Sequence, residues 1–117
     1  MCRLVERETA VIYSILYRLG ITAKYRGFFH ISYAIELCMR QPERLMMVTK
    51  WLYPEVAKHY QTNWSCVERN IRTAANLAWT SIRAYLEELA AAPLTKKPSP
   101  SQFLAILVGY ISSDNAA

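Results

Sequence analysis

Glu68, Arg69 and Arg72 form the strongest candidate group for chemistry in this sequence. Arg69 and Arg72 are three positions apart, so a helix would place them one turn apart on one face. An arginine can donate two hydrogen bonds to guanine, and a glutamate can accept one from the amine of cytosine. Plainer interpretations remain open, because the arginines can line a solvated helix face and Glu68 can form a capping box with Ser65.

A second basic group lies earlier in the chain, where Arg18, Lys24 and Arg26 surround Gly20 with no acidic residue between them. Such a cluster is typical of a solvated loop, and it can equally face phosphates. The net charge of +5 allows a polyanionic partner without requiring one. Nine of the 14 basic residues lie in the first half of the chain, so most of the affinity for a polyanion would come from there.

The remaining reactive side chains are too scattered for an enzyme or a metal site. The three cysteines, Cys2, Cys38 and Cys66, have no close spacing, which argues against a disulfide framework and a zinc site. His30 and His59 lack an acid–nucleophile pattern, and no glycine-rich phosphate loop is present. We therefore expect no enzymatic activity, no metal and no cofactor. Cys38 is expected in the core, and Cys66, near a helix start, is either a plain thiol or a reactive one.

Nothing in the sequence indicates a membrane protein or a secreted one. The longest apolar run, residues 104–108, is far shorter than a membrane span. Charged residues within positions 3–8 interrupt any signal-peptide core. With unpaired cysteines in addition, these features predict a cytoplasmic protein.

Apolar residues recur at helical spacing along most of the chain, and strand signals are missing. The prediction is therefore an all-α fold, a compact bundle of about six helices, in a single domain spanning 1–117 with an ordered core of about 6–111. The helices are expected at about 6–19, 28–40, 43–50, 54–60, 65–79 and 103–111.

Local signals mark several helix ends. Pro54 cannot lie inside a helix and should restart a short one. The helix from 65 either continues toward Ala92 or bends near Thr80 and Ser81, and an extended proline-containing connection covers 93–101. The expected N-cap, N1 and N3 residues of the last helix are Ser99, Pro100 and Gln102. The candidate caps of the helix from 65 are Thr62, Asn63 and Ser65.

The helix at 54–60, the turn at 61–64 and the helix at 65–79 have the dimensions of a helix-turn-helix. Ala57 provides the small side chain that a close helix contact needs. Val67, ten residues later, is expected to pack its branched apolar side chain against Ala57. Such a unit presents the first turns of its second helix to the major groove of DNA. The residues expected to complete the shared core are Val56, Tyr60 and Ile71.

Two segments at this unit carry a family resemblance, LYPEVAK at 52–58 and VERNIRTA at 67–74. Together they resemble the C-terminal effector domain of the sporulation initiation response regulator, the phosphorylation-activated master transcription factor of spore-forming Firmicutes. The likeness extends to LGITAKYRGF at 19–28 and KPSPSQF at 97–103, and it covers about residues 8–111.

The resemblance implies a cofactor-free, all-helical domain that binds double-stranded DNA and reads a short GC-containing box in the major groove. It also implies head-to-tail association on tandem boxes and a contact with the housekeeping sigma factor of RNA polymerase. The residues that it places on bases are Glu68, Arg69 and Arg72. The residues that it places on the DNA backbone are Thr62, Asn63, Ser65, Lys24 and Arg26.

The sequence departs from the family in three ways. Cys66 stands where the family has an arginine, and Trp64 replaces a small residue. The segment at 80–102, which carries the sigma-factor contact in the family, is shorter and lacks the family's glycines. No receiver domain precedes the first helix, so we expect either a free-standing relative or an excised effector domain.

A different class of function remains open, namely a protein-interaction module or a competitor that lacks transcription activation. Aromatic residues could supply its contact surface, although most of them could equally belong to the core. The aromatic residues concerned are Trp51, Tyr53, Tyr60, Trp64 and Tyr85.

Overall fold

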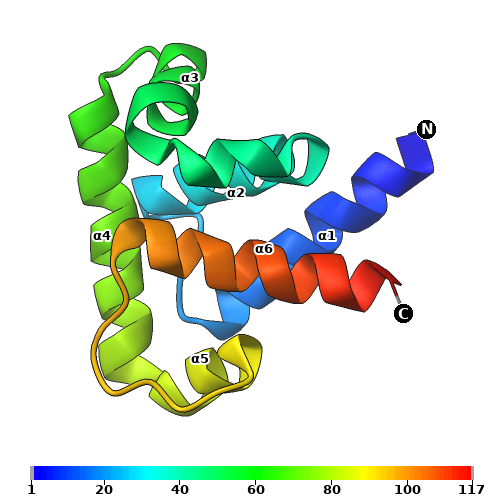
Figure 1. Ribbon diagram of the computed structural model, residues 1–117, viewed down its shortest axis with the longest axis vertical. Helices are drawn as coiled ribbons and strands as arrows, with labels where there is room; N and C mark the ends of the chain where they lie inside the picture. The colour runs from blue at the N-terminus through cyan, green and yellow to red at the C-terminus, as the bar shows by residue number, and fades with distance from the viewer. Residues whose placement is uncertain (1, 117) are drawn as a thin grey trace.

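The computed structural model describes the backbone of residues 2–116 and the side chains of residues 8–113. The described residues form helices and connections without a strand, as the sequence predicts. The elements are α1 (Cys2–Arg18), α2 (Arg26–Arg40), η1 (Pro42–Met46), η2 (Val48–Leu52), α3 (Tyr53–His59), α4 (Trp64–Ser81), α5 (Arg83–Ala90) and α6 (Pro100–Ala116). α3 lies at one end of the long helix α4, α5 lies at the other, and α6 crosses between them (Figure 1).

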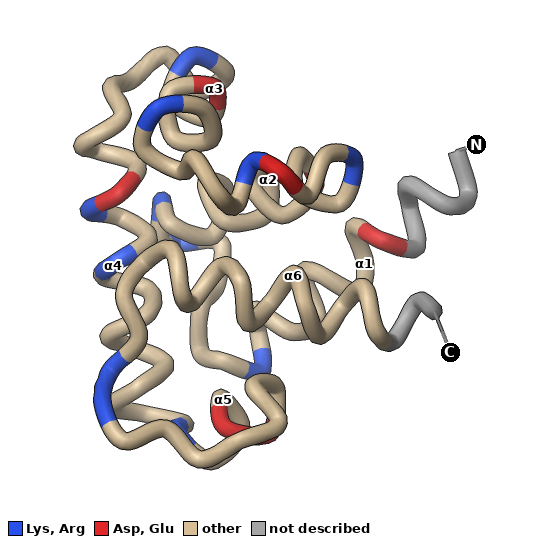
Figure 2. The backbone as a smooth tube through the Cα atoms, viewed as in Figure 1, with Lys and Arg blue, Asp and Glu red and all other residues tan. Residues whose placement is uncertain are grey.

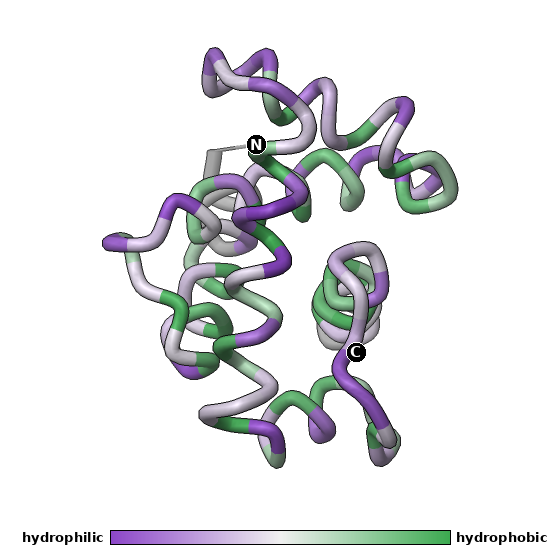
Figure 3. Tube along the Cα trace, turned by 90° about the vertical axis from the view of Figure 1, so that its left-hand side faces the viewer, coloured by the Kyte–Doolittle hydropathy of each residue, from purple (hydrophilic) through white to green (hydrophobic). Residues whose placement is uncertain are grey.

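Helix α2 is the centre of the bundle, because it packs against α1, α3, α4, α6 and η1. Apolar positions recur along the helices and meet in a single core cluster (Figure 3). Cys38 belongs to that core, as expected from its place on an apolar stripe. The fully buried side chains include Leu16, Ile31, Ile35, Ile71 and Leu104.

The start of α6 follows the predicted capping pattern. The Ser99 hydroxyl accepts a hydrogen bond from the Gln102 amide at 3.3 Å, and the Gln102 side-chain oxygen accepts one from the Ser99 amide at 2.9 Å. Pro100 occupies the first helical position, where a missing amide hydrogen costs nothing. The two residues therefore satisfy each other's free amides, and the helix begins where the sequence says it should.

The predicted α-helix at 43–50 is wrong. A 3-10 turn, η1, and a π turn, η2, stand there instead, and they are separated at Met47. Arg44 is held at this place by two contacts: its guanidinium donates to Gln41 Oε1 at 2.6 Å and pairs with Glu55 of α3 at 2.6 Å. Its guanidinium carbon also lies 4.9 Å from the ring centre of Trp51. These contacts fold the segment around one buried arginine.

The long helix from 64 ends at Ser81, so of the two alternatives that the sequence left open the structure adopts the bend near Thr80 and Ser81. Ile82 leaves the helical conformation with φ −146° and ψ 49°, and α5 starts at the next residue. The Thr80 hydroxyl donates to the carbonyl oxygens of Asn76 and Leu77 at 3.0 and 3.2 Å. Because this hydroxyl competes with the helix backbone, it favours the bend.

Helices α2 and α4 cross unusually closely at Gly27. A methyl group at this position would lie 2.6 Å from the carbonyl oxygen of Asn70 and 3.4 Å from the Cβ of Ala74. Backbone atoms cannot move aside as a flexible side chain can, so only glycine permits this crossing. The contact holds the N-terminal end of α2 against the middle of α4.

We expect Gly27→Ala to lower the free energy of unfolding by about 1–3 kcal/mol, because the two helices must separate to admit the methyl group. Gly109→Ala in α6 is the matched control, since nothing lies within 4 Å of a Cβ there. That control should raise the free energy by about 0.5–1 kcal/mol, the usual gain from replacing a mid-helix glycine. Urea titrations followed by circular dichroism measure both, and equal effects of the two variants would contradict the close crossing.

Candidate nucleic-acid interface

Helices α3 and α4 pack against each other. Val56 and Ala57 on α3 and Val67 and Ile71 on α4 are all buried in the common core, which agrees with the sequence prediction. Tyr60 does not belong to this core, because its side chain is 37% exposed. The Tyr60 hydroxyl instead donates to the carbonyl oxygen of Phe29 on α2 at 3.2 Å, which draws the ring out of the α3–α4 contact.

A tight reversal ends α3. Gln61 adopts a left-handed conformation with φ 55°. Its amide donates to the Lys58 carbonyl at 3.3 Å, and the Thr62 amide donates to the Ala57 carbonyl at 2.9 Å. This pair of bonds is the Schellman motif, which satisfies the free carbonyls at a helix end. The reversal turns the chain within four residues, so α4 starts directly beside the end of α3.

Of the three candidate caps, Asn63 is the N-cap of α4, and the alternative of a Ser65–Glu68 capping box is not adopted. The Asn63 side-chain oxygen accepts from the Cys66 amide at 2.9 Å and from the Ser65 hydroxyl at 2.6 Å. Because the helix already begins at Trp64, Ser65 lies inside its first turn. Glu68 is consequently left without a capping role.

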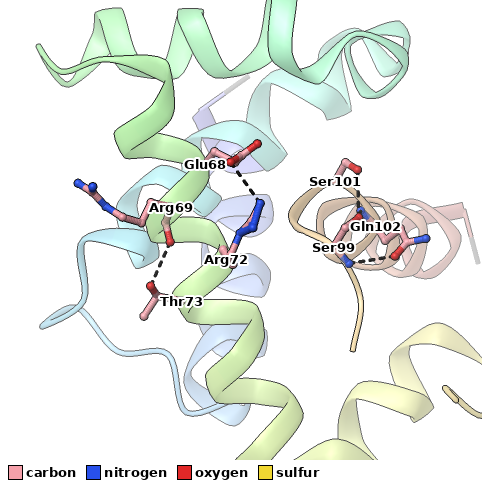
Figure 4. Close-up of polar contacts among 7 residues, drawn as sticks. All are labelled: Glu68, Arg69, Arg72, Thr73, Ser99, Ser101 and Gln102. Carbon is pink, nitrogen blue, oxygen red and sulfur yellow. Dashed lines mark hydrogen bonds and ion pairs between the residues drawn. The ribbon is translucent and has the colours of Figure 1, made fainter. Parts of the chain in front are cut away.

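Glu68 pairs instead with Arg72, one turn further along α4. Their side chains form an exposed ion pair at 3.2 Å, whereas Arg69 points away from both (Figure 4). The Arg69 carbonyl accepts from the Thr73 hydroxyl at 3.0 Å, so only the backbone of Arg69 is engaged there. An exposed pair of this kind contributes about 0.3–0.5 kcal/mol, little enough for DNA to replace it.

The N-terminal end of α2 lies beside the first turns of α4. Arg26 opens α2, and its charge lowers the pKa of both His30 and Cys66, although in each case another effect is larger. Lys24 lies in the preceding loop with its ammonium 5.4 Å from the ring centre of Tyr25, and both basic residues are exposed. The structure therefore brings Arg26 to α4, while Lys24 remains on the adjoining loop.

The family scan agrees with this geometry. The family described as "Sporulation initiation factor Spo0A C terminal" matches residues 12–111. The chain belongs to this family. The Spo0A C-terminal family is a regulatory family rather than an enzymatic one. As a member of it, the chain is a DNA-binding domain of sporulation initiation.

None of the helices described at 2–116 is both long enough and apolar enough to span a membrane. Among the side chains of 8–113, no three His, Cys, Asp or Glu residues are grouped as metal ligands.

Sequence reasoning missed a polar strip that the Spo0A-type fold places near α4. Ser99, Ser101 and Gln102, in the first turn of α6, lie across from Arg72 (Figure 4). Lys96 and Lys97 are exposed in the connection just before them, and basic positions line this side of α4 (Figure 2). The only available signal was a pair of lysines in a proline-containing segment, and their distance from α4 in sequence hid the proximity.

The aromatic residues weighed for a protein-interaction surface are divided among different environments. Tyr53 is buried, and burial raises its pKa to about 12. Trp51 lies under the Arg44 guanidinium, and Tyr85 under that of Arg18, whose carbon is 4.6 Å from the ring centre. The remaining two, Tyr60 and Trp64, are exposed, Trp64 to 45%.

We expect Asn63→Ala to lower the free energy of unfolding by about 1 kcal/mol, the usual effect of losing an N-cap acceptor. Asn63→Asp is the matched control, because it keeps the acceptor oxygen and adds a negative charge that the helix N-terminus favours. Chemical denaturation measures both. Equal losses for the alanine and aspartate variants would show that Asn63 does not cap α4.

Proposed function

We propose that the protein is a sequence-specific transcription regulator of the sporulation-initiation type, with α4 as the recognition helix in the major groove. The observation that supports this most is the exposed first half of α4, which extends Arg69 and Arg72 outward while α3 holds its inner side. Base reading requires a helix that is packed against the protein on one side and exposes arginine side chains on the other. The proposed place of action is the cytoplasm, where such a regulator meets its DNA.

Base reading is assigned to Glu68, Arg69 and Arg72. The Arg69 side chain is exposed, points away from the Glu68–Arg72 pair and has the Cys66 sulfur as its neighbour, so its guanidinium can turn outward and donate two hydrogen bonds to a guanine. Arg72 is held toward Glu68 at 3.2 Å, which limits the directions that its guanidinium can take. Glu68 then either keeps orienting Arg72 or accepts from a cytosine amine beside that guanine.

Contacts with the DNA backbone are assigned to the start of α4 and to the N-terminal end of α2 with the loop before it. The residues of this group are Thr62, Asn63, Ser65, Lys24 and Arg26. Because the Asn63 and Ser65 side chains are engaged in the cap, their part of the contact comes from backbone amides of the first turn. Such amides lack helical acceptors and attract phosphate, as does the helix dipole. Lys24 and Arg26 add positive charge, which makes affinity strongly salt-dependent.

We further propose head-to-tail pairing on tandem boxes and a sigma-factor contact through the segment at 80–102. The family resemblance supports both. Within this segment the connection after α5 is held against the helix, since Glu87 accepts a hydrogen bond from the Leu94 amide at 2.6 Å and Arg83 donates to the Leu94 carbonyl. A segment held in one conformation by such bonds is suited to bind a partner protein in one orientation. Comparing the affinity for one box with that for two measures the pairing.

For the base-reading role, a motif is first selected from random duplexes by the wild-type protein. We expect Arg72→Ala to weaken binding to that motif by about 1–3 kcal/mol and to relax the preference at one base pair. Affinity for random DNA should change little. Arg40→Ala is the charge-matched control, because Arg40 is exposed at the far end of α2 and should affect neither.

Fluorescence anisotropy on both duplexes measures these affinities. An equal loss on selected and random DNA would make Arg72 a phosphate contact instead. Absence of any salt-sensitive binding by the wild type would reject the DNA-reading function and favour a protein-interaction module.

For the backbone role, Arg26→Ala should weaken binding to selected and random DNA alike. The slope of log K against log salt should become shallower by about 1, because one fewer counterion is released. Titrations at four or more salt concentrations give the slope. An unchanged slope would remove Arg26 from the backbone contacts.

A further inference from the structure

A cavity of about 210 Å³ opens where the N-terminal turns of α2 and α4 meet the reversal after α3. Its wall combines a thiol, an imidazole and a guanidinium with two aromatic rings. The lining residues are Arg26, Phe29, His30, Tyr60, Thr62 and Cys66. Both helices direct the positive ends of their dipoles to this place, so the cavity favours an anionic occupant.

Cys66 is the nucleophile of this cavity. Its pKa is lowered, first by a hydrogen bond from Thr62 and further by the positive charges of Arg69 and Arg26, against the opposing effect of burial. The Asn70 amide also donates to its sulfur at 3.6 Å. Cys38 is the opposite case, because it is buried in the core and burial raises its pKa to about 11. Of these two thiols, only Cys66 combines access with thiolate character, which thiol chemistry requires.

His30 gives the cavity a polar group that can form a hydrogen bond with a ligand. Its side chain is 5% exposed, yet the only hydrogen bond that the described residues give it is a 3.5 Å contact from the Asn70 amide to Nδ1. Burial and then Arg26 lower its pKa, so the imidazole is neutral at pH 7. Nε2 forms no hydrogen bond with the described residues and is not shut off from solvent, so it can be reached from the cavity. A polar ligand in the cavity would supply one.

We propose that Cys66 is a modification site, where a carboxylate-bearing low-molecular-weight disulfide is held in this cavity and forms a mixed disulfide with the thiol. The Cys66 thiolate attacks one sulfur, a new S–S bond forms, and the other half leaves as a thiolate. The disulfide is itself the oxidant, so no further co-reactant is needed. Arg26 attracts the carboxylate, and His30 donates or accepts a hydrogen bond within the cavity.

The modification would switch DNA binding off, and this consequence rests on the proposed function. The adduct places bulk and negative charge between Arg26 and Thr62, where the proposed function needs a phosphate. Two anions cannot share that position at low cost, since like charges at close range repel. A reducing thiol reverses the exchange and restores the contact.

The site itself is tested without DNA. The folded protein is treated with glutathione disulfide, which is anionic, with neutral 2-hydroxyethyl disulfide and with cationic cystamine, and peptide mapping assigns each adduct to a cysteine. We expect Cys66 to react faster than Cys38 with every reagent. At Cys66 the anionic disulfide should react about fivefold to tenfold faster than the neutral one, the effect of a single nearby charge–charge contact.

Arg26→Ala should lower that preference markedly, with the remainder coming from Arg69 beside the thiol, whereas Lys24→Ala, a matched loss of charge outside the cavity, should retain most of it. If Cys66 reacted fastest with cystamine, or if the two variants showed the same preference for the anionic disulfide, the proposed site would be wrong. So would a rate at Cys66 no greater than that at Cys38.

The switch is tested on the motif selected by the reduced protein. The adduct should bind it at least about tenfold more weakly, the effect of losing roughly one phosphate contact at close range, and dithiothreitol should restore affinity. Cys66→Ser should bind equally with and without the disulfide. If the adduct binds as tightly as the reduced form, the switch is wrong. If the reduced protein binds no DNA, the proposed function fails, while the reactivity measurement still decides the modification site.

Discussion

The close crossing of α2 over α4 at Gly27 is the constraint on which the rest of the molecule depends. With 2.6 Å between a would-be methyl group and the Asn70 carbonyl, the two helix backbones touch directly. This contact fixes where the first turn of α2 lies along α4. Arg26 therefore stands beside the start of α4 instead of extending freely from a loop. The same crossing brings His30 and Cys66 to one cavity, although they are distant in sequence.

The reversal between α3 and α4 divides its polar groups between structure and function. The Schellman bonds and the Asn63 cap satisfy backbone carbonyl and amide groups at the two helix ends. The polar side chains that these bonds do not use lie on the outside of α4, namely Arg69 and the loosely held Glu68–Arg72 pair. A helix whose ends are satisfied internally can present its outer face without rearranging, and this lowers the entropic cost of binding.

Most of the fold follows from local patterns. The helical period, the restart at Pro54, the bend near Ser81 and the cap at Ser99 each depend on residues a few positions apart, so their physics is complete within one segment. The packing of α3 against α4, with Ala57 and Val67 buried, was also predictable, because only a short turn separates the two helices. Two of the differences from the prediction have a common feature. At 42–52 and at Tyr60, a distant partner, Glu55 or the Phe29 carbonyl, competes with the local preference and prevails.

The sequence by itself determined the helices, most of their ends, the helix pair and the residue types available for reading DNA. The cap at Asn63 and the Glu68–Arg72 pair are also local, and the sequence left them open among several local alternatives. Tertiary structure alone decided which basic residue stands beside α4 and which groups share the cavity. The reason is one of range. Helix formation and capping are fixed by neighbours along the chain, whereas the surroundings of Arg26, His30 and Cys66 depend on how closely two helix backbones can approach. That distance was set by Gly27, whose importance only the packed structure reveals.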